Sequence, residues 1–149
     1  MNTKNKLLIA GSAVLAFVLL TGFRGGHFGG PRDPERVKQM ITWRLDDRLE
    51  HLNATEQQKQ AIHGLKDSLF EDGKRLFEEQ QGARAELVEQ WESPTPNAQA
   101  VHALVDARLE AFRAFAHKVA DAALEAHRIF TPEQRQQVTT QVRERMNAR

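Results

Sequence analysis

The stretch Thr131-Pro132-Glu133-Gln134-Arg135-Gln136-Gln137-Val138 repeats an earlier one, Thr55-Glu56-Gln57-Gln58-Lys59-Gln60-Ala61-Ile62. Each copy has the form Thr-x-x-Gln and leads into a helical pattern. This spacing is typical of a capping box, in which Thr55 or Thr131 accepts a hydrogen bond from the backbone N–H of the glutamine three residues on. That glutamine, Gln58 or Gln134, reaches back to the threonine N–H. The two copies therefore predict two helix starts, and they divide the chain into two helix–turn–helix halves.

Apolar residues recur three and four positions apart along most of the chain, which predicts an all-α protein. Asp33 can cap the first helix, with Pro34 at its first position, and the Ser93-Pro94-Thr95-Pro96 turn ends the second. The four expected helices cover residues 34–53, 55–93, 96–128 and 132–146.

The second helix is the longest, on the order of 55 Å at 1.5 Å per residue. That length is too great for a compact bundle and indicates an elongated, hairpin-like or dimeric architecture. Gly64, Gly73 and Gly82 each weaken this helix by about 1 kcal/mol relative to alanine and are expected bending points. The apolar stripes of the second and third helices include Phe77, Leu87, Val88, Trp91, Val105, Leu109 and Phe112.

Charge is distributed unevenly between the two long helices. Residues 53–92 hold more acids than bases, and residues 93–149 hold more bases than acids. Antiparallel packing of the second helix on the third would be electrostatically compatible, although both charged faces could equally be solvated.

Composition excludes several classes of function. The net charge of +1 and the lack of a basic run interleaved with aromatic residues argue against a nucleic-acid partner. Cysteine is absent, which excludes disulfides, thiol catalysis and the commonest structural zinc ligand. No catalytic motif is present, so we expect no enzyme, no catalytic residue and no required cofactor.

The N-terminus predicts export. Lys4 and Lys6 precede an apolar run, so residues 1–23 form either a signal peptide or, through residues 7–22, an inner-membrane anchor if they are not cleaved. Either alternative places the remainder in the periplasm. Residues 24–34 are rich in glycine and proline, which predicts a flexible tether before a helical domain at 35–149.

The paired Thr-x-x-Gln motifs of this exported, helical chain resemble those of the Spy/CpxP family of periplasmic stress proteins. Related families are the zinc-resistance-associated proteins and the CnrX-type heavy-metal sensors. Family members usually have leucine before each threonine, where this chain has Ala54 and Phe130. The resemblance implies an antiparallel, cradle-shaped homodimer. It also implies ATP-independent, chaperone-like binding of unfolded or envelope proteins, or control of a membrane sensor or anti-sigma partner.

In this family, unfolded clients are thought to bind through mixed basic and apolar residues. The first helix offers such a mixture, and Trp43 lies off its apolar stripe, which favours exposure in the monomer or burial in a dimer seam. The client-binding candidates are Arg36, Lys38, Met40, Trp43, Arg44 and Arg48.

The alternative implied by the resemblance is a sensor or resistance protein for Zn, Ni, Co or Cu. His117 and Asp121 are four residues apart and project from one helix face, where they could share a cation. His51 and His127 occupy equivalent positions before the two motifs and could approach each other. CnrX-type sensors have methionine near the third-helix histidine, whereas Asp121 stands four residues after His117 here, so the sensor pattern is not reproduced. Each histidine could also be an ordinary surface residue.

Overall fold

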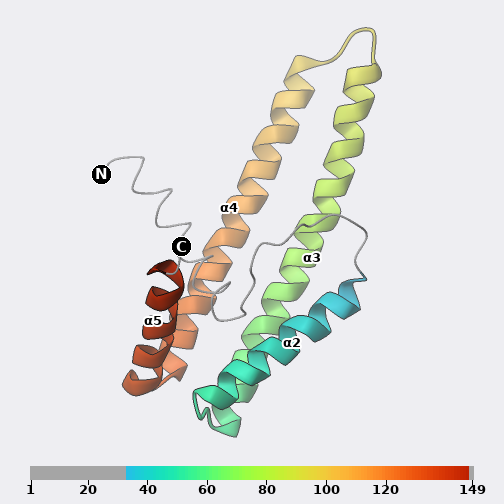
Figure 1. Cartoon of the computed structure of the whole chain (residues 1–149). Helices are drawn as coiled ribbons and strands as arrows, with labels where there is room; N and C mark the ends of the chain where they lie inside the picture. The colour runs from blue at the N-terminus through green and yellow to red at the C-terminus, as the bar shows by residue number, and fades with distance from the viewer. Residues whose placement is uncertain (1–32, 148–149) are drawn as a thin grey trace, which may run out of the picture.

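Capping side chains set the ends of the helices. The computed structural model describes residues 33–147, which form four helices and no strand (Figure 1). Asn97 Oδ1 accepts a hydrogen bond from the Ala100 N–H at 3.1 Å, so the third helix begins at Ala98, slightly later than predicted. The helices are α2 (Pro34–His51), α3 (Glu56–Glu92), α4 (Ala98–Ile129) and α5 (Pro132–Asn147).

The two long helices α3 and α4 form an antiparallel hairpin, and the turn between them lies at one end of the molecule (Figure 1). The shorter helices α2 and α5 lie beside the half of the hairpin at the opposite end, where the other two turns are found. We call residues 77–112 the tip half and the remaining described residues the base half. The all-α, hairpin-like fold in two helix–turn–helix halves is therefore confirmed.

The hydrophobic core lies in the base half. One cluster joins α2, α3 and α4, and a second joins α3 and α4 one or two turns closer to the tip. In the tip half, only Ala83 is buried. The buried members of the two clusters are Leu45, Leu49, Leu52, Ile62, Ala126 and Phe130, and then Leu69, Val119 and Ala122.

Ion pairs join α3 to α4 with the polarity that the charge distribution predicts. Lys118 Nζ of α4 lies 2.9 Å from Asp72 Oδ2 of α3, and Arg108 NH1 of α4 lies 3.2 Å from Glu79 Oε2 of α3. Acidic residues of α3 thus meet basic residues of α4, as antiparallel packing requires.

Helix α3 continues through all three of its glycines. A Cβ on Gly73 would lie 3.4 Å from Cζ of Phe115, whereas nothing lies within 4 Å of a Cβ on Gly64 or Gly82. A Cβ at Gly73 would therefore be in van der Waals contact with Phe115 of α4, whereas the other two glycines have no packing role among the described residues. The predicted length of this helix is confirmed, since it has 37 residues.

A residue in the left-handed region reverses the chain after α2. Asn53 has φ +50°, and the N–H of Ala54 bonds to the carbonyl of Leu49 at 2.9 Å. Asparagine tolerates this backbone conformation better than most residues do. After this reversal, Thr55 caps the start of α3 only four residues after α2 ends at His51.

Several predictions concern residues beyond the described part of the chain. The signal peptide or anchor at 1–23 and most of the tether at 24–34 lie there. Asp33 and Pro34, the last residues assigned to the tether, are the cap and first residue of α2. Within residues 33–147, no helix is both long enough and apolar enough to cross a membrane. The homodimer stays a prediction.

Candidate functional site

The two motif glutamines meet between the helix halves. Gln58 Oε1 accepts from the Thr55 N–H, and Gln134 Oε1 accepts from the Thr131 N–H, both at 2.9 Å. The threonine hydroxyls accept in return from the glutamine N–H groups, at 3.2 and 3.3 Å. Both predicted capping boxes are therefore confirmed.

Each glutamine also bonds across to the other half. Gln58 Nε2 donates to Gln134 Oε1 at 2.9 Å, and Gln134 Nε2 donates to Gln58 Oε1 at 3.2 Å. Each amide donates its second hydrogen to a backbone carbonyl at a turn of the opposite half. Gln58 Nε2 donates to Ile129 O at 2.9 Å, and Gln134 Nε2 donates to Leu52 O at 3.1 Å. We call this arrangement the glutamine clasp. Because each amide uses both donors and both acceptor positions, the clasp is a structural feature with no group left for chemistry.

The predicted client-binding residues of α2 differ in their exposure. Trp43 is 69% exposed, as its position off the stripe predicts, and Arg36 is exposed while Met40 and Arg44 are half-buried.

Lys38 and Arg48 of this set contact other helices of the molecule. Lys38 Nζ lies 3.7 Å from Asp67 and 3.8 Å from Glu71, and it sits 5.6 Å from the centre of the Phe70 ring. Arg48 NH1 donates to Gln141 Oε1 of α5 at 3.1 Å. These two side chains therefore attach α2 to α3 and α5, and a role in client binding stays a prediction for the set.

The predicted metal ligands do not belong to a larger group of potential metal-binding side chains among the described residues. His117 and Asp121 are both exposed on α4, and His51 Nδ1 lies 2.7 Å from the carbonyl oxygen of Asp47. His127 is exposed in the last turn of α4. Across residues 33–147, no group of three or more His, Cys, Asp or Glu residues is placed to hold a metal ion. The pair at 117 and 121 supplies two of the four ligands that zinc usually takes, and metal binding stays a prediction.

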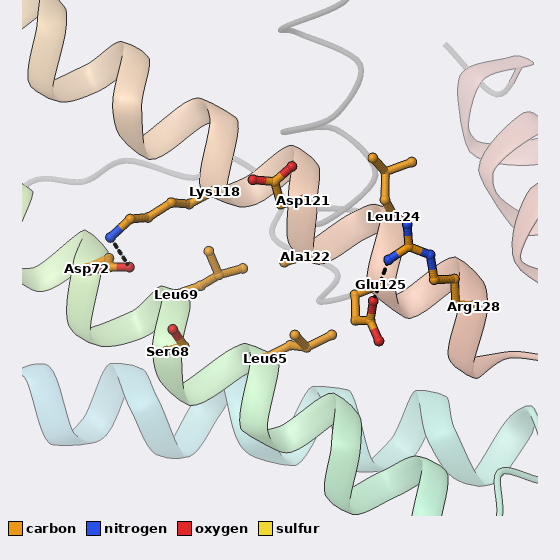
Figure 2. A pocket seen from close by; sticks show the side chains of 10 residues that line it. All are labelled: Leu65, Ser68, Leu69, Asp72, Lys118, Asp121, Ala122, Leu124, Glu125 and Arg128. Atoms are coloured by element: carbon orange, nitrogen blue, oxygen red, sulfur yellow. Dashed lines mark hydrogen bonds and ion pairs between the residues drawn. The ribbon is translucent and has the colours of Figure 1, made fainter.

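A groove of about 520 Å³ lies between α3 and α4 in the base half (Figure 2). Leu65, Leu69 and Ala122 contribute apolar lining. Lys118 and Asp72 pair at one end of the groove, and Arg128 and Glu125 pair at the other at 2.8 Å (Figure 2).

The charges of the groove are largely neutralised by these pairs. The hydrogen bond from Lys118 lowers the pKa of Asp72, and this effect together with Arg75 outweighs the opposing influence of burial. The carboxylate of Asp72 is therefore held ionised in an ion pair at the edge of the groove. It is not placed to act as a general acid.

The tip half carries a second surface, which is apolar. Trp91 is 88% exposed, Leu109 63% and Phe77 60%. We call the exposed large apolar residues of the tip half the bare face; they are Phe77, Leu87, Val88, Trp91, Val105, Leu109 and Phe112.

Helical spacing places most of these residues on one side of the hairpin. At 3.6 residues per turn, Phe77 lies two turns beyond Phe70, which Lys38 of α2 contacts, so the bare face continues the side of α3 that α2 covers. On α4, Leu109 lies about 120° around the helix from the groove residue Asp121 and about 160° from Glu125. The bare face and the groove therefore lie on opposite sides of the hairpin.

Helix length explains why this face is uncovered. Helix α2 has 18 residues against 37 in α3, and α5 has 16 against 32 in α4. At 1.5 Å per residue the flanking helices cover only about half of the hairpin. The sequence pattern placed these residues on the apolar stripes of the two long helices, and in the tip half the single chain leaves this side of the stripes exposed. An exposed apolar patch of this kind marks a surface for interaction.

Comparison with known proteins gives one match. The family model described as LTXXQ motif family protein matches residues 40–141, which include both motifs and both long helices. Searches of curated proteins and of solved structures found no match.

Proposed function

The chain belongs to the LTXXQ motif family, and from that premise we propose that it is a chaperone-like protein of the periplasm. It binds unfolded envelope proteins on the bare face without using ATP. The observation that carries the proposal is the exposure of large apolar residues along one side of the tip half, where a folded single chain has no structural use for them. Export directed by residues 1–23 and the family's typical location support the periplasm as its compartment.

The shape of the surface suits loose and general binding. Trp91, Phe77 and Leu109 lie on two helices and do not form a closed pocket, so no particular side chain is selected. Burial of apolar area contributes about 25 cal/mol per Å², and much of that is offset by the cost of ordering the client. A client held this weakly can leave and fold, which suits a compartment without ATP.

The base half contributes rigidity to this proposal. The glutamine clasp and the two core clusters fix the hairpin at one end. The tip half can therefore present apolar side chains without collapsing onto them.

Light scattering of a reduced, aggregating client in the presence of the full chain tests the proposal. The double variant Phe77→Ser with Leu109→Ser removes two large side chains of the bare face. The matched control, Leu124→Ser with Met146→Ser, removes two side chains of similar exposure outside it, at 59% and 61%.

We expect the unmodified chain and the control to suppress aggregation, with and without a metal chelator, and the bare-face variant to lose most of the suppression. Suppression that is equal in both variants would place client binding elsewhere. Failure of the unmodified chain to suppress aggregation would overturn the proposal. Suppression that depends on added zinc or nickel would instead favour the metal-binding alternative.

A further inference from the structure

The bare face lies in a part of the chain that carries a net negative charge. From Phe77 to Phe112 the chain carries seven acids and two bases, a net charge of −5, although the whole chain has a net charge of +1. The rest of the chain therefore carries +6, and the apolar surface coincides with the most acidic part of the molecule. The seven acids are Glu78, Glu79, Glu86, Glu89, Glu92, Asp106 and Glu110.

Most of these carboxylates are not neutralised within the described part of the chain. Arg108 pairs with Glu79 at 3.2 Å, and Glu110 pairs with Arg113 at 3.6 Å. The other five acids form no ion pair with the side chains that the structure describes, and all five are exposed. Arg84 is the remaining base of the tip half. The field at the bare face is consequently negative.

Three of the five lie in the last turns of α3, the end of the helix that also carries the most exposed apolar side chain, Trp91. Glu86, Glu89 and Glu92 are spaced three residues apart, and Trp91 and Val88 lie between them in sequence. Helix α3 has no basic residue in its last turn to offset them. At about 100° per residue, Glu92 lies about 100° around α3 from Trp91, and Glu89 and Glu86 lie about 160° and 140° around it. These carboxylates therefore act on a client at Trp91 through the field of the tip half and not by direct contact.

We infer that the bare face selects unfolded segments that are both apolar and positively charged, with lysine or arginine interspersed among leucine and aromatic residues. This inference rests on the proposed function and names its class of client. Carboxylates attract such a segment over a distance of about 10 Å at 0.1 M salt, and the apolar side chains then hold it. Acidic clients are repelled for the same reason. Two copies that approached with their tips together would also repel each other. An antiparallel pair would instead bring the tip half of one copy to the positively charged base half of the other, and the last experiment below tests for that occupant.

Two fluorescent peptides test the inference. Both are unstructured, about 20 residues long, and share the same leucine and phenylalanine positions, but one carries five lysines where the other carries five glutamates. Binding to the full chain is measured by fluorescence anisotropy at low and high salt. We expect the lysine peptide to bind about tenfold more tightly at low salt, with the difference shrinking as screening increases.

Matched charge variants locate the effect. Glu86→Gln, Glu89→Gln and Glu92→Gln together remove three charges at the tip, whereas Glu35→Gln, Glu50→Gln and Glu144→Gln remove three from exposed positions in the base half. Both triple variants have the same net charge. We expect only the tip variant to lose most of the preference for the lysine peptide.

The outcomes separate the inference from the proposed function. Equal binding of both peptides, or equal loss in the two triple variants, would overturn the inference while leaving client binding intact. Failure of both peptides to bind, together with unhindered client aggregation, would overturn the proposed function itself. If sedimentation shows a stable dimer that dissociates on Trp91→Ser and excludes both peptides, a second copy is the occupant and the inference is wrong.

Discussion

At the scale of single residues, the two motif glutamines stabilise the base half because each fills hydrogen-bonding positions of the other's side-chain amide. Gln134 is only 8% exposed, so its amide depends on protein partners and not on water. We expect Gln58→Ala to lower the free energy of unfolding by about 2–3 kcal/mol, because it removes the bond to Ile129 O and leaves the Gln134 amide short of partners. Urea unfolding followed by circular dichroism measures this change.

The neighbouring residue provides the control for the clasp. Gln57 is exposed and forms no hydrogen bond with other described residues through its side chain, so Gln57→Ala should change stability by less than about 0.5 kcal/mol. The double variant of Gln58 and Gln134 should cost clearly less than the sum of the two single variants, because the residues share two hydrogen bonds. Additive costs would mean that the two glutamines act independently and that the clasp does not hold the halves together.

A second residue-scale prediction concerns acid. The pKa of Asp72 is lowered from its ordinary value of 3.8, chiefly by the hydrogen bond from Lys118. A carboxyl with a lowered pKa in the folded state stabilises the protein above its unfolded pKa, and this contribution disappears as the pH falls through the folded value. We expect Asp72→Asn to lose less stability than the unmodified chain between pH 5 and pH 2 in thermal unfolding. Asp106→Asn, at an exposed and unpaired position, should follow the unmodified chain. Parallel acid curves for the chain and Asp72→Asn would show that the bond to Lys118 contributes nothing.

At the scale of helices, the glycines of α3 have different surroundings and so give different predictions. Alanine favours a helix interior over glycine by up to about 1 kcal/mol. A Cβ at Gly64 or Gly82 meets nothing within 4 Å, so Gly64→Ala and Gly82→Ala should each raise the stability by about 0.5–1 kcal/mol. At Gly73 the new methyl group would meet Phe115 at 3.4 Å, and the gain should be smaller or absent. Equal gains at all three positions in urea unfolding would show that the contact between Gly73 and Phe115 does not restrict the helix.

Local sequence rules predicted the helices well, because the signals for caps and stops lie within a few residues. Thr55 and Thr131 cap the helices that the motifs predict, and the turn after Glu92 ends α3. The cross-bonds of the glutamine clasp could not be predicted this way, since Gln58 and Gln134 are 76 residues apart and meet only after the halves pack. The bare face was missed for a similar reason. Periodicity identifies an apolar side of a helix, whereas the lengths of α2 and α5 decide how much of that side is covered. A comparison of the predicted helix lengths could therefore have revealed from the sequence that the tip half is uncovered.

At the scale of the whole molecule, stability and exposed apolar surface are found at opposite ends. The base half contains both core clusters and the glutamine clasp, whereas the tip half buries only Ala83 and is held together mainly by side chains along the α3–α4 seam, such as the pair Arg108–Glu79. This separation suits a client-binding protein, because the surface that must remain available is not needed for folding. It also predicts that the two ends open independently.

Hydrogen exchange measures that difference directly. Exchange of a backbone amide requires local opening, and openings are least costly where few apolar contacts are buried. We therefore expect the amides of residues 85–105 to exchange at least tenfold faster than those of residues 115–130, which pack against both core clusters. Adding the lysine peptide should slow exchange in the tip half and leave the base half unchanged, whereas the glutamate peptide should have little effect. Uniform protection along α3 and α4 in the free chain would mean that the tip half has buried its apolar side chains, most simply against a second copy. In that case exchange should become faster in the tip half on dilution, since dissociation would expose the bare face, and the single-chain description of that face would have to be replaced by one of a dimer.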